Sequence, residues 1–321
     1  MITMTTTETM KAVRIHKFGG PEVLQLENVP RPEPGTHQVL VRIHAAGVNP
    51  VDWKIREGHL GKIPLPSIMG SDFSGEIEAL GPDVTEFRVG ESVFGSVADE
   101  SGSYAQYALA PVNHIVEKPA AIDHVHAAAT PVPALTAWQA LFDHAKLRSG
   151  QKILIHGASG GVGHFAVQFA KWKGAYIIGT GSGANADLVR KLGAHEFIDY
   201  RTTRFEDVVR DADVVFDTIG DETQERSWNA LRRGGVLVSI VEPPSETIAA
   251  AHGARGIFVR EDATRNEELT QIARLVASGQ IKVNVETVMS LTEARKAQEL
   301  SQSGHAHGKI VLTVDAESGA G

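Results

Sequence analysis

The stretch from Gly157 to Gly161, Gly-Ala-Ser-Gly-Gly, carries two motifs with different chemistry. Read as G-x-S-x-G, it is the turn that exposes the nucleophilic serine of a serine hydrolase, here Ser159. Read from Ala158 as A-x-G-x-x-G, it is a Gly-rich turn that accommodates the pyrophosphate of a dinucleotide. Both motifs need a strand before the turn and a helix after it, and the neighbouring runs KILIH and VGHFAVQFAKWK supply both.

A hydrolase needs an acid and a histidine later in the chain. The residues available for these roles are Asp199, Asp217, His252 and His305. No oxyanion loop of the HGGG type precedes the turn, and no strands of the same sheet precede it either, although this class of hydrolase has both. The dinucleotide interpretation explains more residues, because Gly160 lets the backbone approach the pyrophosphate and Gly163 lets the helix pack closely on the strand.

The elements that must position this turn alternate in a regular way. The short apolar runs KILIH, AYIIGT and EFIDY are each followed by a segment with a helical pattern (VGHFAVQFAKWK, ADLVRKLG and FEDVVRD), and two further strand-like runs, DVVFDTIG and GVLVSIV, come after them. This alternation is typical of βαβ units with a parallel sheet, which binds ligands at the carboxyl ends of its strands. From Lys11 to about Pro133, short strands such as QVLVRIHAAGV are broken by Gly and Pro, which indicates a mainly β, barrel-like domain.

We therefore predict an α/β fold in which a doubly wound Rossmann domain, residues 134–279, is inserted into a mainly β domain. The mainly β domain comprises residues 11–133 and 280–321, since the strand-like runs KVNVETVMSL and GKIVLTV return near the end. The Thr-rich residues 1–10 are expected to be a disordered leader.

Composition narrows the class of protein. The 321 residues have a net charge of −8, which disfavours nucleic acid as a partner. The absence of cysteine excludes disulfides, thiolate catalysis and Cys-rich zinc sites. No run reaches the ~20 apolar residues of a membrane helix, and the N-terminus lacks the apolar core of a signal peptide. We therefore expect a cytoplasmic protein without membrane contact.

The strand after the Gly-rich turn indicates the type of dinucleotide. NAD enzymes place an acid about 20 residues after the turn to bind the ribose 2′-hydroxyl. Here the strand leads into GTGSGAN, where Thr180, Ser182 and Asn185 are small neutral groups suited to a 2′-phosphate, with Arg201 or Arg204 as cationic help. The sequence therefore favours NADPH.

The chain also resembles the zinc-free medium-chain dehydrogenase/reductase family, in particular its quinone oxidoreductase (zeta-crystallin-like) branch, from about Lys11 to Val314. The resemblance rests on KAVRIHKFGGPEVLQLENVPRPEPG, VLVRIHAAGVNPVDWKIREG, ASGGVG, LGAHEFIDYR, VVFDTIG and SGHAHGKIVL. It implies a GroES-like barrel domain, a six-stranded dinucleotide-binding domain, NADPH and a homodimer.

Position by position, the resemblance implies a set of cofactor-binding residues. They are Thr136, Gly160, Gly161, Val162, Ser182, Tyr200, Thr218, Gly220, Ile240, Val241, Phe258, Val259 and Lys309. For each of them, ordinary turn formation or core packing is the alternative.

The resemblance also bears on catalysis and metals. Zinc-dependent relatives have a catalytic Cys at the place of Asn49 and a G-H-E motif at the place of Gly70-Ser71-Asp72, so zinc catalysis is not expected. The pairs His124/His126 and His305/His307 lack a third ligand and are expected to be solvated loop or helix-start residues.

One residue departs from the family pattern. Well-known quinone reductases have a Tyr five residues after the Asn, whereas this chain has Lys54. Lys54 either hydrogen-bonds a substrate carbonyl oxygen and neutralises its developing charge, or forms a structural ion pair with Asp52, Glu57 or Asp72.

The resulting hypothesis is an NADPH-dependent, zinc-independent oxidoreductase that reduces a quinone or an α,β-unsaturated carbonyl. Asn49 and Lys54 would orient or polarise the carbonyl oxygen. Two alternatives remain, namely a serine hydrolase that uses Ser159 and a non-catalytic protein that binds NADPH as a ligand.

Overall fold

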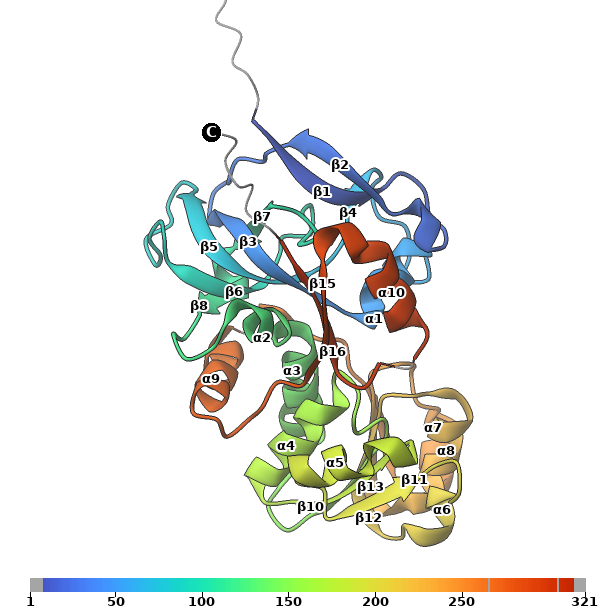
Figure 1. The fold of residues 1–321 in the computed structure, drawn as a ribbon. Helices are drawn as coiled ribbons and strands as arrows, with labels where there is room; N and C mark the ends of the chain where they lie inside the picture. The colour runs from blue at the N-terminus through green and yellow to red at the C-terminus, as the bar shows by residue number, and fades with distance from the viewer. Residues whose placement is uncertain (1–7, 265, 305, 315–321) are drawn as a thin grey trace, which may run out of the picture. The chain divides into compact units, whose positions relative to one another are not determined.

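The computed structural model describes residues 8–264, 266–304 and 306–314. The described residues form two compact units, drawn in Figure 1. Unit 1 takes those within Met1–Val132, Ala263–Ala277 and Val285–Gly321, and unit 2 takes those within Pro133–Asp262 and Ser278–Asn284.

Unit 1 is mainly β. Its strands are β1 (Thr9–Ile15), β2 (Gln25–Pro30), β3 (Gln38–Val48), β4 (Ser67–Ile68), β5 (Asp72–Leu80), β6 (Ser92–Ser96), β7 (Tyr107–Pro111), β8 (Ile115–Glu117), β15 (Val285–Ser290) and β16 (Lys309–Thr313). Its helices are α1 (Pro50–Arg56), α2 (His124–Ala128), α9 (Asn266–Ala277) and α10 (Ala294–Gln302), with 3-10 turns η1 (Pro21–Val23), η2 (Val112–His114) and η6 (Leu291–Glu293). The larger sheet has the order β15-β16-β3-β5-β6-β8, with β7 paired to β3, and the smaller one has the order β2-β1-β4.

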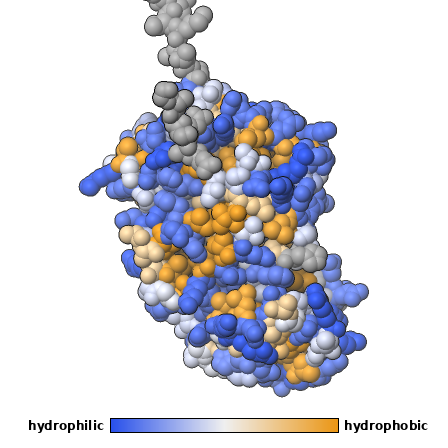
Figure 2. All heavy atoms as spheres, in the orientation of Figure 1, coloured by the Kyte–Doolittle hydropathy of each residue, from blue (hydrophilic) through white to orange (hydrophobic). Residues whose placement is uncertain are grey.

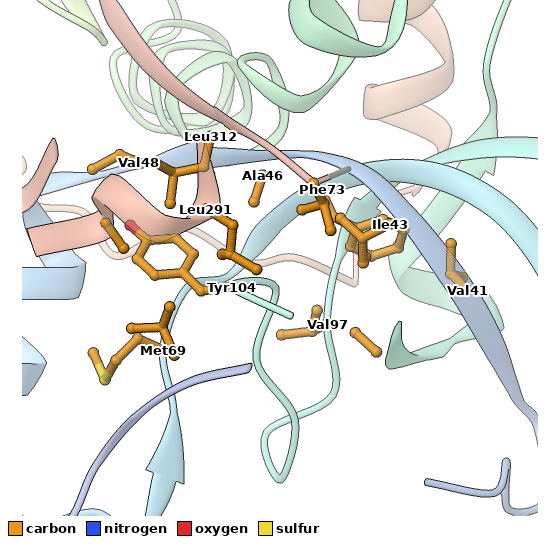
Figure 3. Packing of buried hydrophobic residues seen from close by; sticks show 14 of the residues in the cluster. Val41, Ile43, Ala46, Val48, Met69, Phe73, Val97, Tyr104, Leu291 and Leu312 are labelled. Carbon is orange, nitrogen blue, oxygen red and sulfur yellow. The ribbon is translucent and has the colours of Figure 1, made fainter. Parts of the chain in front are cut away.

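The core of unit 1 lies between these strands. Figure 3 shows part of it, including Phe73, Leu291 and Leu312, with the ring of Tyr104 packed among them. The return of β15 and β16 explains how a distant part of the chain completes this core. The apolar alternation of QVLVRIHAAGV predicts β3 at the bounds that the structure has.

The expected leader ends earlier than the sequence suggested. Residues 1–7 lie outside the described residues, but β1 already begins at Thr9. Met10 is buried and packs with Val29 and Ala105, because its side chain continues the inward-facing alternation of β1. The prediction of disorder is therefore wrong for Thr9 and Met10.

Unit 2 is a doubly wound parallel sheet in the order β11-β10-β9-β12-β13-β14. Its strands are β9 (Lys152–Ile155), β10 (Tyr176–Gly181), β11 (Glu196–Asp199), β12 (Ala212–Asp217), β13 (Leu231–Ser239) and β14 (Arg255–Phe258). Its helices are α3 (Pro131–Trp138, beginning just before the unit), the π-helix η3 (Gln139–His144), α4 (Gly163–Lys173), α5 (Ala186–Leu192), α6 (Phe205–Val208), α7 (Asp221–Ser227) and α8 (Glu246–Ala251), with 3-10 turns η4 (Gly183–Asn185) and η5 (Trp228–Ala230).

The two faces of this sheet are covered by different helices. Alternate strand residues such as Leu154 and Val215 pack against Phe205, Trp228 and Ala249 of α6, η5 and α8. Helix α4 packs beside β9 and β10. The predicted arrangement, a doubly wound parallel sheet combined with a mainly β domain, is confirmed.

The surface is that of a charged protein. Figure 2 shows hydrophilic residues over much of the visible face, with apolar residues between them. Isolated exposed apolar side chains such as Leu60 and Val89 are ordinary on a folded protein. Within residues 8–264, 266–304 and 306–314, no helix combines the length and the apolar character needed to cross a membrane.

Candidate functional site

The Gly-rich turn joins β9 to α4 and is shaped by close backbone contacts. Gly157 has φ of 61°, in the left-handed region that favours glycine. A methyl group on Gly163 would lie 2.1 Å from the carbonyl oxygen of Gly157, so only glycine fits there. Val162 precedes α4 with an apolar side chain that cannot cap the helix, and the positive end of the helix dipole favours an anion there. The turn thus fits the pyrophosphate of a dinucleotide.

The remaining cofactor residues predicted for unit 2 also follow strand ends, with one exception. Ser182 follows β10, Tyr200 follows β11, Thr218 and Gly220 follow β12, Ile240 and Val241 follow β13, and Phe258 and Val259 lie at the end of β14. Since all six strands are parallel, these residues share the carboxyl edge of the sheet with the Gly-rich turn. The exception is Thr136, which is buried within α3.

Thr180 differs from the other predicted residues because its hydroxyl belongs to a buried network. The Ser227 hydroxyl donates to the Thr223 carbonyl at 2.6 Å, so it accepts from His156 Nε2 at 2.9 Å. His156 Nδ1 then accepts from Thr180 Oγ1 at 3.0 Å. Burial lowers the pKa of His156 to about 4, which keeps the ring neutral. The Thr180 hydroxyl is therefore engaged within the protein, whereas the donor role of Ser182 and Asn185 toward a 2′-phosphate stays a prediction.

An acidic residue that the sequence analysis did not weigh for this role lies beside the loop after β10. Asp199 ends β11 and pairs in register with Gly181 of β10. A methyl group on Gly183 would lie 2.4 Å from Asp199 Oδ2, and Asp199 Oδ1 accepts from the Arg201 N–H at 3.0 Å. The loop therefore combines a carboxylate with neutral and cationic groups. The parallel pairing of β10 with β11 brings Asp199 to this loop, and the number of residues between the Gly-rich turn and Asp199 does not reveal that pairing.

Asp217 is a second residue that the sequence analysis assigned differently, as a possible acid of a hydrolase. It is fully buried at the end of β12. Its Oδ1 accepts from the N–H groups of Ile219 and Gly220, at 3.0 and 2.9 Å, and its Oδ2 accepts from Ser239 Oγ at 2.9 Å. Asp217 therefore holds the loops after β12 and β13 in place.

Unit 1 holds a buried polar cluster around Asn49. The Asn49 amide Nδ2 donates to Asp72 Oδ2 at 2.8 Å. The Lys309 ammonium donates to Asn49 Oδ1 and, at 2.8 Å, to the Val48 carbonyl. Because an ammonium can only donate and a carboxylate can accept, these partners fix the orientation of the amide. Within the described part of the chain, the second Nδ2 hydrogen of Asn49 has no acceptor.

Two further residues extend this cluster. Asp52 Oδ2 accepts from the Asn49 backbone N–H at 2.8 Å and from the Tyr104 hydroxyl at 2.8 Å. Burial raises the pKa of Asp52 to about 6, opposed by these two hydrogen bonds. Burial also raises the pKa of the Tyr104 hydroxyl, and the Asp52 carboxylate raises it further.

The same burial perturbs the two partners of the Asn49 amide. Burial raises the pKa of Asp72 to about 7, even though the Lys309 ammonium and the Asn49 amide act in the opposite direction. Burial lowers the pKa of Lys309, and the carboxylates of Asp72 and Asp52 oppose this. Such mutually perturbed buried groups are typical of functional sites.

The structure thus joins two residues that the sequence analysis assigned to different roles. Asn49 was predicted to be catalytic and Lys309 to bind the cofactor, whereas both belong to one cluster in unit 1. The prediction from the sequence missed three residues of this cluster, namely Asp52, Asp72 and Tyr104. The sequence offered two indications of them, an acid three positions after Asn49 and the acid of the Gly-Ser-Asp motif.

Lys54 lies on α1 and is partly exposed, with its Nζ 5.7 Å from the centre of the Trp53 ring. The carboxylates proposed as its structural partners have other partners. Asp52 and Asp72 are held by the cluster around Asn49, and Glu57 is bound by Arg56 and Gln302. Among the described residues, no ion pair joins Lys54 to any of these three carboxylates, and its role toward a substrate stays a prediction.

Comparison with known proteins identifies the family. Residues 35–120 match the alcohol dehydrogenase GroES-like domain, and residues 192–312 match a profile described as zinc-binding dehydrogenase. The chain is 35% identical to the quinone oxidoreductase of Rattus norvegicus, covering 94% of this chain and 97% of the relative. The chain belongs to the medium-chain dehydrogenase/reductase family.

Solved structures of family members agree with this assignment. The quinone oxidoreductase of Coxiella burnetii has a TM-score of 0.90 at 33% identity, covering 96% of this chain and all of the other. The Escherichia coli quinone oxidoreductase complexed with NADPH has a TM-score of 0.87 at 29% identity, covering 94% and 99%. The predicted resemblance to the quinone oxidoreductase branch is confirmed, and the protein is an NAD(P)H-dependent oxidoreductase.

Family membership also bears on Ser159. The Gly-rich turn around it has the close glycine contacts of a dinucleotide-binding turn. Of the acids and histidines named for a hydrolase, Asp217 and Asp199 accept hydrogen bonds from other groups, and His305 lies outside the described residues. Neither the family nor the geometry supports the serine hydrolase alternative.

Proposed function

We propose that this protein is an NADPH-dependent, zinc-independent oxidoreductase that transfers hydride to a quinone or to the β-carbon of an α,β-unsaturated carbonyl. The observation that supports this most directly is the fixed amide of Asn49, whose remaining Nδ2 hydrogen can be donated to a carbonyl oxygen. NADPH supplies the hydride when it is bound at the carboxyl edge of the sheet in unit 2.

The residues of this chain stabilise the charge that develops on the substrate oxygen. Lys309 and Asp72 already hold the Asn49 amide in place, so the amide does not have to reorient when the substrate oxygen gains negative charge. Lys54 adds a second donor and a positive charge. Quinones and enones delocalise the charge onto oxygen, so a donor and a cation can serve where zinc-dependent relatives have a metal.

The residue types support a reaction that does not use zinc. Where zinc-dependent relatives have a Cys ligand, this chain has Asn49, and the Lys309 ammonium is bound to its amide oxygen. An amide that is already engaged by an ammonium and a carboxylate is a poor ligand for zinc.

NADPH is proposed over NADH because Ser182 and Asn185, after β10, are neutral and Arg201, after the neighbouring β11, is cationic; the Asp199 carboxylate beside this loop acts in the opposite direction. Two of the similar solved structures were determined with NADPH, including the one from Escherichia coli. We further propose that the protein works as a homodimer in the cytoplasm, without nucleic acid or membrane partners.

The test is the loss of reduced-nicotinamide absorbance with a panel of quinones and enones, using NADPH and NADH in parallel. Asn49→Ser removes the amide donor and is expected to lower kcat/KM by roughly a hundredfold. Asn113→Ser, at an exposed position of η2, is the matched control and should behave like the wild type.

Three outcomes would contradict parts of the proposal. Full activity of Asn49→Ser would exclude the amide from the mechanism, and full activity of a Lys54→Met variant would exclude Lys54. Equal or better rates with NADH would refute the cofactor preference. Tight NADPH binding without turnover of any acceptor would instead favour the non-catalytic, ligand-binding alternative.

A further inference from the structure

Three residues on unit 1 form a cluster of metal-ligand type outside the Asn49 cluster. They are His44 on β3, Glu76 on β5 and His124 at the first position of α2, and each offers one ligand atom within 4.8 Å of the others. The sequence analysis considered His124 only together with His126, and that pair lacks a third ligand. The fold instead brings His124 close to His44 and Glu76. The spacing of these residues in the sequence does not indicate that they meet.

A β-bulge directs His44 toward the cluster. In the pairing of β3 with β5, Ile43 lies opposite Gly75 and Ala45 lies opposite Ser74, so His44 is the extra residue between them. Bulges of this kind commonly redirect a side chain beside a functional site. His44 Nε2 is buried and, among the described residues, has no hydrogen-bond partner. It lies 3.6 Å from Glu76 Oε2, which is too long for a hydrogen bond.

The hydrogen bonds of His124 leave one ring nitrogen available as a ligand. The Ser74 hydroxyl donates its only hydrogen to the Val93 carbonyl at 3.1 Å, so it accepts from His124 Nδ1 at 2.9 Å. The Nδ1 atom therefore carries the proton, and Nε2 carries the lone pair. Metal-binding histidines are typically oriented in this way by a second partner.

The rings of His44 and His124 also face each other. Their centroids are 4.4 Å apart with an angle of 33° between the planes. Two imidazoles and one carboxylate are the ligand types that zinc prefers in sites with an open position. Tetrahedral zinc separates its ligand atoms by about 3.4 Å, so the ligand atoms, which lie within 4.8 Å of one another, need only small side-chain rotations. All three side chains are partly exposed, which permits such rotations.

We propose that His44, Glu76 and His124 bind a divalent transition metal, with Zn²⁺ as the best-matched ion. Glu76 is already paired with Arg42, and that pairing neutralises part of the carboxylate charge. The site is therefore expected to bind zinc reversibly, with water completing the coordination, rather than as a permanent structural ion. The proposal does not depend on the proposed reductase activity, because none of the three residues belongs to the Asn49 cluster.

The experiment titrates Zn²⁺ into the full-length protein after chelator treatment and desalting, by calorimetry. The wild type is expected to bind one high-affinity zinc per chain. His44→Gln, His124→Gln and Glu76→Gln should each weaken binding by tenfold or more, and Ser74→Ala should weaken it by about tenfold to a hundredfold through loss of the ring orientation. His126→Gln, on the same helix with its ring bound to Asp123, is the matched control and should bind like the wild type.

Two further measurements keep the result interpretable. Co²⁺ in place of Zn²⁺ should give the visible absorption of a low-coordinate site in the wild type and in His126→Gln, but not in His44→Gln. Circular dichroism of the metal-free variants checks the fold, and if His44→Gln does not fold, Glu76→Gln and Ser74→Ala carry the test.

The proposal is overturned if the wild type binds no zinc at micromolar concentration. It is also overturned if the three Gln variants bind zinc as the wild type does, or if His126→Gln loses binding to the same extent. Chelator-treated wild type should still oxidise NADPH, so failure of zinc binding and failure of the proposed reductase function are separate results.

Discussion

Replacing Lys309 by Met is expected to loosen the pairing of β16 with β3. The variant keeps a long apolar side chain but removes the ammonium that donates to Val48 and Asn49. Each buried acceptor left without a donor costs about 1–3 kcal/mol. The expected loss is therefore about 3 kcal/mol at pH 6, which corresponds to roughly a hundredfold faster exchange of the strand amides.

The loss should increase with pH in a way that identifies its cause. Burial raises the pKa of Asp72 from 3.8 in the unfolded chain to about 7 in the folded protein. In the wild type, this group therefore lowers the free energy of unfolding as the pH rises from 3.8 to 7. Above pH 7 it causes no further change. Without the ammonium the pKa of Asp72 rises further, so stability continues to fall above pH 7. With Asp72 kept protonated up to pH 8 in the variant, the linkage relation gives an added loss of about 0.1 kcal/mol at pH 6 and about 1.4 kcal/mol at pH 8.

Hydrogen exchange followed by mass spectrometry on peptides from β3 and β16 measures this effect. The strand β9 of unit 2 is an internal reference, and Lys296→Met, an exposed position on α10, is the matched control. After correction for the intrinsic pH dependence of exchange, the difference between Lys309→Met and the wild type should grow about tenfold from pH 6 to pH 8. Wild-type exchange rates in β3 and β16, or a difference that is independent of pH, would refute the assigned role of Lys309.

Two further predictions concern unit 2. Gly163→Ala should lower the melting temperature, since its methyl group would lie 2.1 Å from a backbone oxygen, with a loss of about 1–3 kcal/mol. In Gly160→Ala the methyl group would lie 3.2 Å from the same oxygen, so this variant should fold nearly normally but bind NADPH more weakly. Equal losses of melting temperature in the two variants would contradict the packing argument. Asp199→Asn removes a negative charge beside the loop after β10 and should lower the KM for NADPH roughly twofold to fivefold, with little change for NADH. An unchanged KM ratio would mean that Asp199 does not face the 2′ position.

The fold could be predicted largely because apolar periodicity is local information. The strand β3 and the βα alternation of unit 2 follow directly from it. Helix α7, with the sequence DETQERS, was missed because it has almost no apolar face. The predicted helix FEDVVRD is reduced to the single turn of α6 at Phe205–Val208.

The candidate site was predictable only in part, for a related reason. Asn49 and Lys309 were both singled out, but they are 260 residues apart and nothing in the sequence joins them. The carboxylate of Asp199 reaches the loop after β10 through strand pairing, and His44 reaches His124 through a bulge. Such contacts depend on register, which composition and spacing do not specify.

The bond between Lys309 and Asn49 also bears on the order of folding. During synthesis Asn49, Asp52 and Asp72 emerge long before β16, so the barrel at first holds its buried carboxylates without the cation that compensates them. Contacts between such distant residues form slowly. The amide of Asn49 acquires its fixed orientation only when β16 pairs with β3. A chain interrupted before β16 would therefore lack both a strand of the barrel and the proposed reductase activity, which couples completion of translation to completion of the site.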